Sequence, residues 1–192
     1  MDEPVAEGWE DGWREFHHGV VVGRFWVGPP WEEPAAGVEP IVIDPGRAFG
    51  TGAHPTTRLT LELLQELPQG SLLDVGCGSG VLSIAAARLG FSPVLALDND
   101  EHAVAATAAN AAVNGAEVAA RRADALTDEL PETDLALANI ALDLVERLLP
   151  RLSASRAVTS GYLVADRPAA NGWAHVERRE RDGWAADLLE RA

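Results

Sequence analysis

Residues 71–90 read SLLDVGCGSGVLSIAAARLG, and this stretch decides the fold. It opens with a short apolar run, continues through Gly76, Gly78 and Gly80, and passes into an apolar segment that ends at Gly90. We interpret it as a strand at 71–75, a glycine-rich turn and a helix that together cover 71–90. In an open parallel sheet such a turn lies at the carboxyl end of the strand, where these sheets bind ligands.

The chain after this turn alternates short apolar runs with longer segments of helical pattern. Strands are predicted at 93–98, 117–124, 134–140 and 156–164, and helices at 101–115 and 142–152. This alternation requires crossover connections and therefore a mainly parallel sheet. The last run, 174–190, carries Asp182-Gly183 between two extended segments, which predicts an antiparallel hairpin at the edge of the sheet.

The chain before the turn is rich in Trp, Pro, Gly and Glu. We predict a short helix at 9–16, strands at 20–27 and 41–44, and a helix at 56–67 with Thr56 or Thr57 as its N-cap. Residues 1–45 are expected to form an N-terminal extension packed on the core, and residues 46–192 the main domain. A length of 192 residues suits one α/β domain rather than two.

Charge and cysteine content exclude several classes of protein. The formal net charge of −15, with no lysine in the chain, argues against direct nucleic-acid binding and suits a basic protein partner. Cys77 is the one cysteine, and no Cys/His cluster has the spacing of zinc ligands, so we expect no metal. The acidic N-terminus does not resemble a signal peptide, and no apolar run approaches the roughly 20 residues of a membrane span, so we expect a cytoplasmic protein.

The class of ligand follows from the glycine spacing and from two carboxylates. A dinucleotide fingerprint is G-x-G-x-x-G, whereas the glycines of DVGCGSG stand two apart. Asp74, just before the loop, repels a pyrophosphate but suits a positively charged ligand. Asp98, followed by Asn99, ends the next predicted strand at the distance where an acid usually takes ribose hydroxyls. This arrangement favours S-adenosylmethionine; a tight turn with nothing bound is the alternative.

The pattern D-x-G-x-G-x-G followed by an acid at the end of the second strand resembles the common seven-strand, class I methyltransferases. The resemblance implies an α/β, Rossmann-like, doubly wound, mainly parallel sheet with helices on both faces. It also implies that Asp124, after the third predicted strand, stands near the adenine amino group of S-adenosylmethionine. A solvated loop carboxylate is the other interpretation of Asp124.

A second segment narrows the family. Residues 43–64, IDPGRAFGTGAHPTTRLTLELL, resemble the signature of the bacterial methyltransferases that modify amino groups, lysine side chains among them, of the eleventh protein of the large ribosomal subunit. The resemblance extends over most of the chain. It implies that a lid formed by Phe49, Gly50, Thr51 and Gly52 closes over the methionine part of the cofactor, with His54, Thr56 and Thr57 beside it. For His54, a structural cap and a catalytic base are both open.

Methyl transfer to an amine requires a neutral nitrogen held near the donor. Desolvation beside a sulfonium lowers the pKa of a lysine, so the site needs hydrogen-bond acceptors more than a strong base. Asn139, at the end of the predicted strand 134–140, supplies a side-chain oxygen for this purpose. We predict that Asn139 is catalytic and contacts the cofactor; a buried Asn that caps a strand end is the alternative.

Three alternatives to a ribosomal-protein methyltransferase stay open. Members of the resembled family carry a substrate-recognition domain before the segment that EGWEDGW, residues 7–13, matches, and most or all of that domain is expected to be missing here. The target is then another protein or a small amine, or the chain is a catalytically idle module that binds S-adenosylmethionine. A nicotinamide or flavin oxidoreductase fits the alternating fold, but the glycine spacing and Asp74 oppose it.

Overall fold

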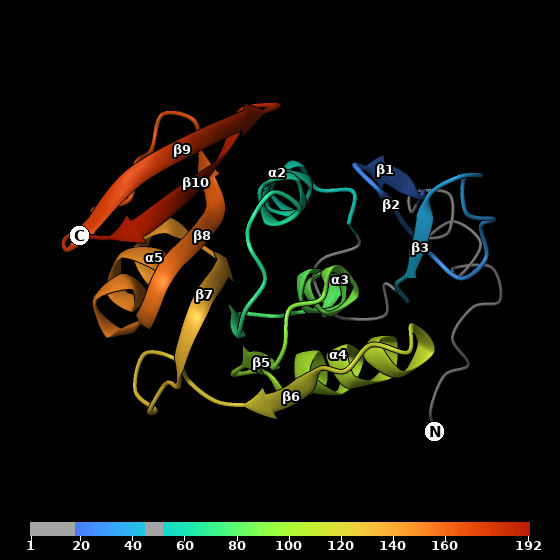
Figure 1. Cartoon of the computed structure of the whole chain (residues 1–192), viewed down its shortest axis with the longest axis horizontal. Helices are drawn as coiled ribbons and strands as arrows, with labels where there is room; N and C mark the ends of the chain where they lie inside the picture. The colour runs from blue at the N-terminus through green and yellow to red at the C-terminus, as the bar shows by residue number, and fades with distance from the viewer. Residues whose placement is uncertain (1–17, 45–51) are drawn as a thin grey trace, which may run out of the picture.

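The computed structural model describes residues 18–44 and 52–192. Its larger sheet has seven strands in the order β6-β5-β4-β7-β8-β10-β9 (Figure 1). These are β4 (Leu72–Val75), β5 (Val94–Asp98), β6 (Ala119–Arg122), β7 (Glu132–Asn139), β8 (Ser153–Leu163), β9 (Trp173–Arg181) and β10 (Trp184–Arg191). The first five strands in this order, β6, β5, β4, β7 and β8, are parallel. Strand β10 runs antiparallel to both of its neighbours, β8 and β9. The predicted mainly parallel sheet with an antiparallel C-terminal hairpin is confirmed.

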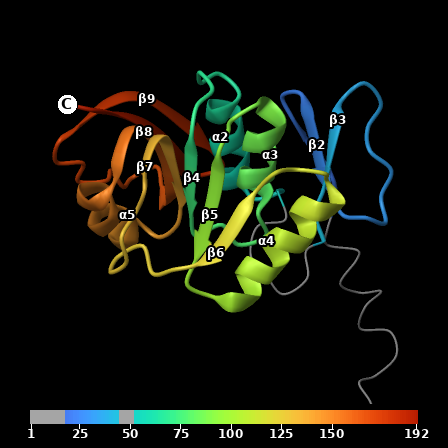
Figure 2. The same ribbon diagram turned by 60° about the horizontal axis from the view of Figure 1, so that its bottom comes forward.

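Helices cover both faces of this sheet (Figures 1 and 2). On one side lie α2 (Pro55–Leu64), α3 (Val81–Leu89) and α4 (Glu101–Val113), and on the other lies α5 (Leu142–Leu148) with a 3₁₀ turn after it (Leu149–Arg151). Alternate residues of a strand point to opposite faces, so Leu72 joins the core under α2 and α3 while Leu73 and Val75 join the core under α5. The predicted doubly wound arrangement is therefore correct.

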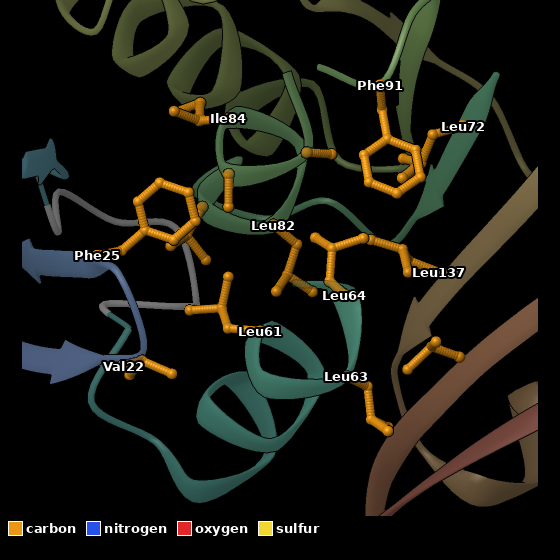
Figure 3. Packing of buried hydrophobic residues seen from close by; sticks show 14 of the residues in the cluster. Val22, Phe25, Leu61, Leu63, Leu64, Leu72, Leu82, Ile84, Phe91 and Leu137 are labelled. Carbon is orange, nitrogen blue, oxygen red and sulfur yellow. The ribbon is translucent and has the colours of Figure 1, made fainter. Parts of the chain in front are cut away.

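A second, three-stranded sheet precedes the larger one, in the order β1 (Val20–Val22), β2 (Phe25–Gly28) and β3 (Glu39–Val42). The single strand predicted at 20–27 is wrong, because β1 and β2 form an antiparallel hairpin around Gly23, whose φ of +58° suits a tight turn. Strand β3 pairs in parallel with β2 and lies two residues earlier than predicted. Val22 and Phe25 pack against Leu61 of α2 and the neighbouring side chains of α3 (Figure 3).

The start of α2 also differs from its prediction. Neither Thr56 nor Thr57 is the N-cap; His54 is, with an extended backbone and with its side chain accepting a hydrogen bond from the Thr56 N–H. Pro55 explains the shift, because proline has no N–H to donate and its fixed φ suits the first position of a helix. The helix predicted at 9–16 lies outside the described residues, and no helix among residues 18–44 and 52–192 is long and apolar enough to cross a membrane.

Candidate functional site

The register of the sheet brings three predicted residues together. Val75 of β4 pairs with Leu97 of β5 and with Ala138 of β7, so the residues that follow them, Gly76, Asp98 and Asn139, lie at the same edge of the sheet. A cavity of about 600 Å³ opens there, within the size range of cofactor sites. Among the described residues, those that line it are His54, Thr56, Val75, Gly76, Gly78, Leu97, Asp98, Asn99, Ala123, Asp124, Ala125, Leu126, Asn139, Ile140, Ala141, Leu144, Leu148, Gly161 and Trp184.

The glycine-rich turn is fixed against β5. The N–H groups of Gly76 and Cys77 donate to the Leu97 carbonyl over 2.8 and 3.1 Å. Gly76 and Gly78 have positive φ, and both line the cavity. Gly80 does not line it: a Cβ atom there would lie 2.9 Å from the Thr107 side chain of α4. The third glycine therefore allows close packing of the turn on α4, and contact of Gly80 with a ligand stays a prediction.

Asp98 reaches the turn with its carboxylate. Its Oδ2 accepts a hydrogen bond from the Gly78 N–H and its Oδ1 from the Asp100 N–H, each over 3.0 Å. Two backbone donors thus hold the carboxylate in one orientation, and each oxygen retains a lone pair for the hydroxyl groups of a ligand. Asn99 lines the cavity beside Asp98. Both residues thus line the cavity, and their contact with the ribose of a ligand stays a prediction.

Asp124 also lines the cavity, from the loop after the neighbouring strand β6. Its Oδ1 accepts a hydrogen bond from the Leu126 N–H over 2.9 Å, and its own N–H donates to Asp128. Leu126, Ala125 and Ala123 line the cavity around it. An acceptor flanked by apolar side chains suits the exocyclic amino group of a purine, and this role of Asp124 stays a prediction.

Asp74 is not among the residues that line the cavity. It shares the α3 face of β4 with Leu72, and its Oδ2 accepts a hydrogen bond from Ser83 Oγ over 2.5 Å. The side chain is 1% exposed, and its Oδ1 has no hydrogen-bond partner in the described part of the chain. The pKa of this carboxyl is raised to about 6: burial is the largest cause, the hydrogen bond from Ser83 opposes it, and the nearby Asp98 charge adds to it. Contact of Asp74 with a ligand therefore stays a prediction.

The wall opposite the glycine-rich turn comes from the start of α2 and from β7. Asn139 Nδ2 donates to Thr57 Oγ1 over 3.4 Å, which ties the end of β7 to α2. Thr57 is buried behind this contact and does not line the cavity, whereas Thr56 does. His54 Nδ1 lies 2.8 Å from Thr56 Oγ1, and burial lowers the pKa of His54, which favours the neutral imidazole.

Trp184 and Gly161 belong to the site although their sequence context did not predict it. Trp184 opens β10, and because β10 is antiparallel to β8 its first residue arrives at the carboxyl edge of the sheet. Its ring meets the His54 ring edge to face, with centroids 4.8 Å apart. Gly161 has a φ of +103°, and a Cβ atom there would lie 2.1 Å from the Ile140 carbonyl oxygen. A glycine inside a predicted strand was the available signal for such a close approach.

The predicted lid can be followed only in part. Phe49, Gly50 and Thr51 lie outside the described residues. Gly52 is buried with a φ of +88°, and a Cβ atom there would lie 2.3 Å from Val27, so this glycine allows the chain to pass close to β2. Gly52 does not line the cavity. Within the described ranges no group of three or more His, Cys, Asp or Glu side chains is arranged to hold a metal ion.

Relatives of known structure share this fold. The ribosomal protein L11 methylase of Lactobacillus delbrueckii subsp. bulgaricus superposes with a TM-score of 0.81 at 29% sequence identity, over 91% of this chain and 98% of that one. A 16S rRNA methyltransferase, RmtF, solved in complex with S-adenosyl-L-homocysteine, superposes with a TM-score of 0.55 at 19% identity, over 73% of this chain and 66% of that one. At that identity the second match concerns the fold alone.

Sequence comparison gives a narrower result. The ribosomal protein L11 methyltransferase of Geotalea uraniireducens is 43% identical over 176 residues, which cover 82% of this chain and 56% of the relative. That of Symbiobacterium thermophilum is 40% identical over an alignment of 198 positions, gaps included, that covers 95% of this chain and 65% of the relative. The chain thus spans less than two thirds of the length of either relative. The family described as ribosomal protein L11 methyltransferase (PrmA) matches residues 1–191, and the chain belongs to this family.

Proposed function

We propose that this chain is the catalytic domain of an S-adenosylmethionine-dependent methyltransferase that modifies amino groups, of lysine side chains or of the N-terminus, in a ribosomal protein. The names of its relatives make the L11 protein the first candidate substrate. The observation that carries the proposal is the cavity in which a glycine-rich turn and Asp98 face Asn139 from the neighbouring strand β7. The formal net charge of −15 suits a basic protein partner.

The residues of the cavity fit the cofactor. The Asp98 carboxylate, held by two backbone N–H groups, accepts the ribose hydroxyls. Asp124 accepts the adenine amino group, and the apolar side chains around it contact the faces of the base. Gly76 and Gly78 leave room for the ligand along the turn. Bound there, S-adenosylmethionine supplies an activated methyl group.

Asn139 positions the incoming amine. Its Nδ2 donates to Thr57, so its Oδ1, which accepts no hydrogen bond within the described residues, is the acceptor available to the cavity. An amine that donates one hydrogen to Oδ1 directs its lone pair away from Asn139, and the orientation of the nitrogen is then fixed. The low-dielectric lining around Ile140, Leu144 and Trp184 favours the neutral amine over the ammonium. His54 and Trp184 line the same side of the cavity and shape the space for the amine.

Ligand binding is the first test of the proposal. Calorimetric titration of the purified protein with S-adenosylmethionine should give one site per chain, whereas NADH should give no heat. Asp98→Asn should weaken the binding at least tenfold, because its amide group would turn a donor toward a backbone N–H. Glu132→Gln is the matched control: it also removes one negative charge, but at the first residue of β7, the end of that strand away from the cavity. This variant should bind like the wild type. Failure of the wild type to bind would refute the proposal at its base.

The amine substrate is the second test. The protein with methyl-labelled S-adenosylmethionine should label ribosomal protein L11, and blocking the amino groups of that protein by acetylation, which removes the nucleophilic lone pair, should abolish the labelling. Transfer to another protein or to a small amine instead would retain the chemistry and change the substrate. Binding without transfer to any amine would identify an idle cofactor-binding module.

A further inference from the structure

One polar face of α4 joins the glycine-rich turn to the N-terminal sheet. Thr107, Asn110 and Asn114 stand three and four residues apart, so their side chains share one side of the helix. Thr107 and Asn110 are 0% and 3% exposed. Buried polar side chains in a helix that otherwise presents alanines to the core require partners, and these three find them outside the helix.

Thr107 binds the turn. Its Oγ1 lies 3.0 Å from the Gly78 carbonyl oxygen and 3.3 Å from Cys77 Sγ. Gly78 is the residue whose N–H donates to the Asp98 carboxylate. Gly78 is therefore held at both of its backbone groups: its carbonyl by the Thr107 hydroxyl and its N–H by the Asp98 carboxylate.

Asn114 binds the N-terminal sheet. Its Oδ1 accepts a hydrogen bond from the Val42 N–H over 2.8 Å, and its Nδ2 donates to the Val42 carbonyl over 2.7 Å. Both backbone groups of Val42, the last residue of β3, are thus satisfied by one amide side chain. Within the described part of the chain the Asn114 side chain makes hydrogen bonds to Val42 and to the Asn110 carbonyl but none to the turn, so Asn114 serves as a control for Asn110.

Asn110 binds both. Its Nδ2 donates to the Ser79 carbonyl over 2.9 Å, and its Oδ1 accepts from the Asp44 N–H over 3.1 Å. Ser79 lies in the glycine-rich turn, and Asp44 follows β3 by two residues. The Asn110 side chain thus links two segments, at Asp44 and at Ser79, that are 35 residues apart in the sequence.

We infer that Asn110 is a positioning residue that couples ligand binding at the glycine-rich turn to the docking of the end of β3. A ligand that fixes the turn also fixes Ser79, and with it the amide group that holds Asp44. The same coupling acts in reverse, because an equilibrium linkage between two sites is reciprocal. The apolar contacts of Val22 and Phe25 attach the rest of the small sheet to α2 and α3, so the polar link determines the placement of its last strand rather than the presence of the sheet.

The inference rests on the proposed function only for the choice of ligand, S-adenosylhomocysteine, and the experiment separates the two. Amide hydrogen exchange of the wild-type protein is measured by NMR with and without saturating ligand, after calorimetry has established binding. The Asp44 amide, which donates to Asn110, should exchange at least threefold more slowly in the complex. Absence of binding would refute the proposed function, whereas binding with an unchanged Asp44 rate would overturn the coupling and leave the proposed function standing.

Three variants locate the link. Thr107→Val removes the hydroxyl at nearly constant shape, and it should weaken the ligand about three- to tenfold while the Asp44 amide still slows at saturation. Asn114→Ala should speed the exchange of the Val42 amide and leave ligand affinity within twofold of the wild type. Asn110→Ala should weaken the ligand about three- to tenfold, and its Asp44 rate should no longer respond to saturating ligand.

A purely structural role for Asn110 predicts a different result. If the role were purely structural, Asn110→Ala would have a lower melting temperature than the wild type. Its ligand affinity and the slowing of Asp44 amide exchange by ligand would match those of Asn114→Ala. That pattern would overturn the inference. If Asn110→Ala does not fold, the wild-type exchange measurement still tests the coupling itself, because an Asp44 rate that does not respond to ligand would overturn it.

Discussion

Asn139 Nδ2 donates a long hydrogen bond of 3.4 Å to Thr57 Oγ1, and this contact joins the end of β7 to the first turn of α2 across 82 positions of sequence. The donor end of the amide is thereby directed to α2. The oxygen end is left to the cavity, where the proposed amine requires an acceptor.

Asn139→Ala should therefore retain S-adenosylmethionine affinity within about threefold while turnover falls on the order of 100-fold, because orientation of the amine is lost. Calorimetry and steady-state methylation assays measure the two quantities. Thr57→Val, which removes only the acceptor that orients Asn139, should lower turnover by about three- to tenfold at unchanged affinity. Equal losses of affinity and turnover in Asn139→Ala would contradict the assigned role.

Asp74 predicts an unusual dependence of stability on pH. Its folded-state pKa of about 6 lies above the ordinary value of 3.8, so the unfolded chain loses this proton at lower pH than the folded chain does. The carboxyl group therefore lowers the free energy of unfolding progressively between about pH 4 and pH 6, and its full cost is present above that range. Asn has no proton to lose, so Asp74→Asn should gain stability relative to the wild type by roughly 1 kcal/mol between pH 5 and 7.5.

Urea-induced unfolding over that range measures the difference. Asp134→Asn is the control: hydrogen bonds from Ser71 lower the pKa of Asp134 below its ordinary value of 3.8, so both its folded and unfolded forms are ionised throughout. The difference between Asp134→Asn and the wild type should be constant from pH 5 to 7.5. A constant difference for Asp74→Asn as well would show that its carboxyl is ionised at pH 5 and not perturbed by burial.

Gly161→Ala should damage both stability and activity. Its φ of +103° disfavours any side chain, and the new Cβ would collide with the Ile140 carbonyl, next to Asn139. We expect a loss of about 2–4 kcal/mol in the free energy of unfolding and at least a tenfold fall in turnover.

Gly172→Ala is the matched control for this position. Gly172 has a φ of +82°, but nothing lies within 4 Å of its added Cβ. It should lose about 1 kcal/mol through backbone strain and keep wild-type turnover. Chemical unfolding and methylation assays compare the two variants, and equal effects would show that the Ile140 contact is relieved without displacing the site.

His54 should behave as a helix cap. His54→Ala should lose about 1 kcal/mol, because the Thr56 N–H is left without its side-chain acceptor, whereas His54→Asn should retain most of the stability. Turnover of His54→Asn should stay within about tenfold of the wild type, since the loss is that of the ring contact with Trp184. Thermal unfolding and the pH profile of turnover distinguish the roles: a fall as large as that of Asn139→Ala, with the acidic limb of the profile removed, would make His54 a base.

The sequence predicted the larger sheet well because its signals are local. Each βα unit shows an apolar run, then a turn, then a segment with helical periodicity. The glycines of DVGCGSG indicate the edge of the sheet at which a ligand is expected to bind. The hairpin at Asp182-Gly183 was also predicted from local sequence, since its turn residues stand between two extended segments. Gly76, Gly78, Asp98, Asn99 and Asn139 line one cavity at that edge, together with Asp124, which the family resemblance had indicated.

The errors arose where tertiary contacts decide the outcome. Gly23 was not recognised as a turn because VVVGRFWV is apolar on both sides of it, and only pairing of Val22 with Phe25 divides the run into two strands. The two-residue alternation of β4 also directs the Asp74 side chain beneath α3 toward Ser83 rather than to the cavity lining, and its expected contact with a ligand stays a prediction. Trp184 was not expected at the cavity. The sequence of β10 does not indicate that this strand lies beside β8 and begins at the edge of the sheet where the cavity opens.

The position of β10 also has a consequence for how the chain is made. It is the last strand in sequence, yet it lies between β8 and β9 in the sheet. During synthesis β8 therefore presents an unpaired edge, and β9 has no place to dock, until residues 184–191 have left the ribosome. Trp184 enters the cavity at the same moment. A nascent chain cannot complete the described cavity before residues 184–191 have emerged, and until then the edge of β8 is exposed to mispairing.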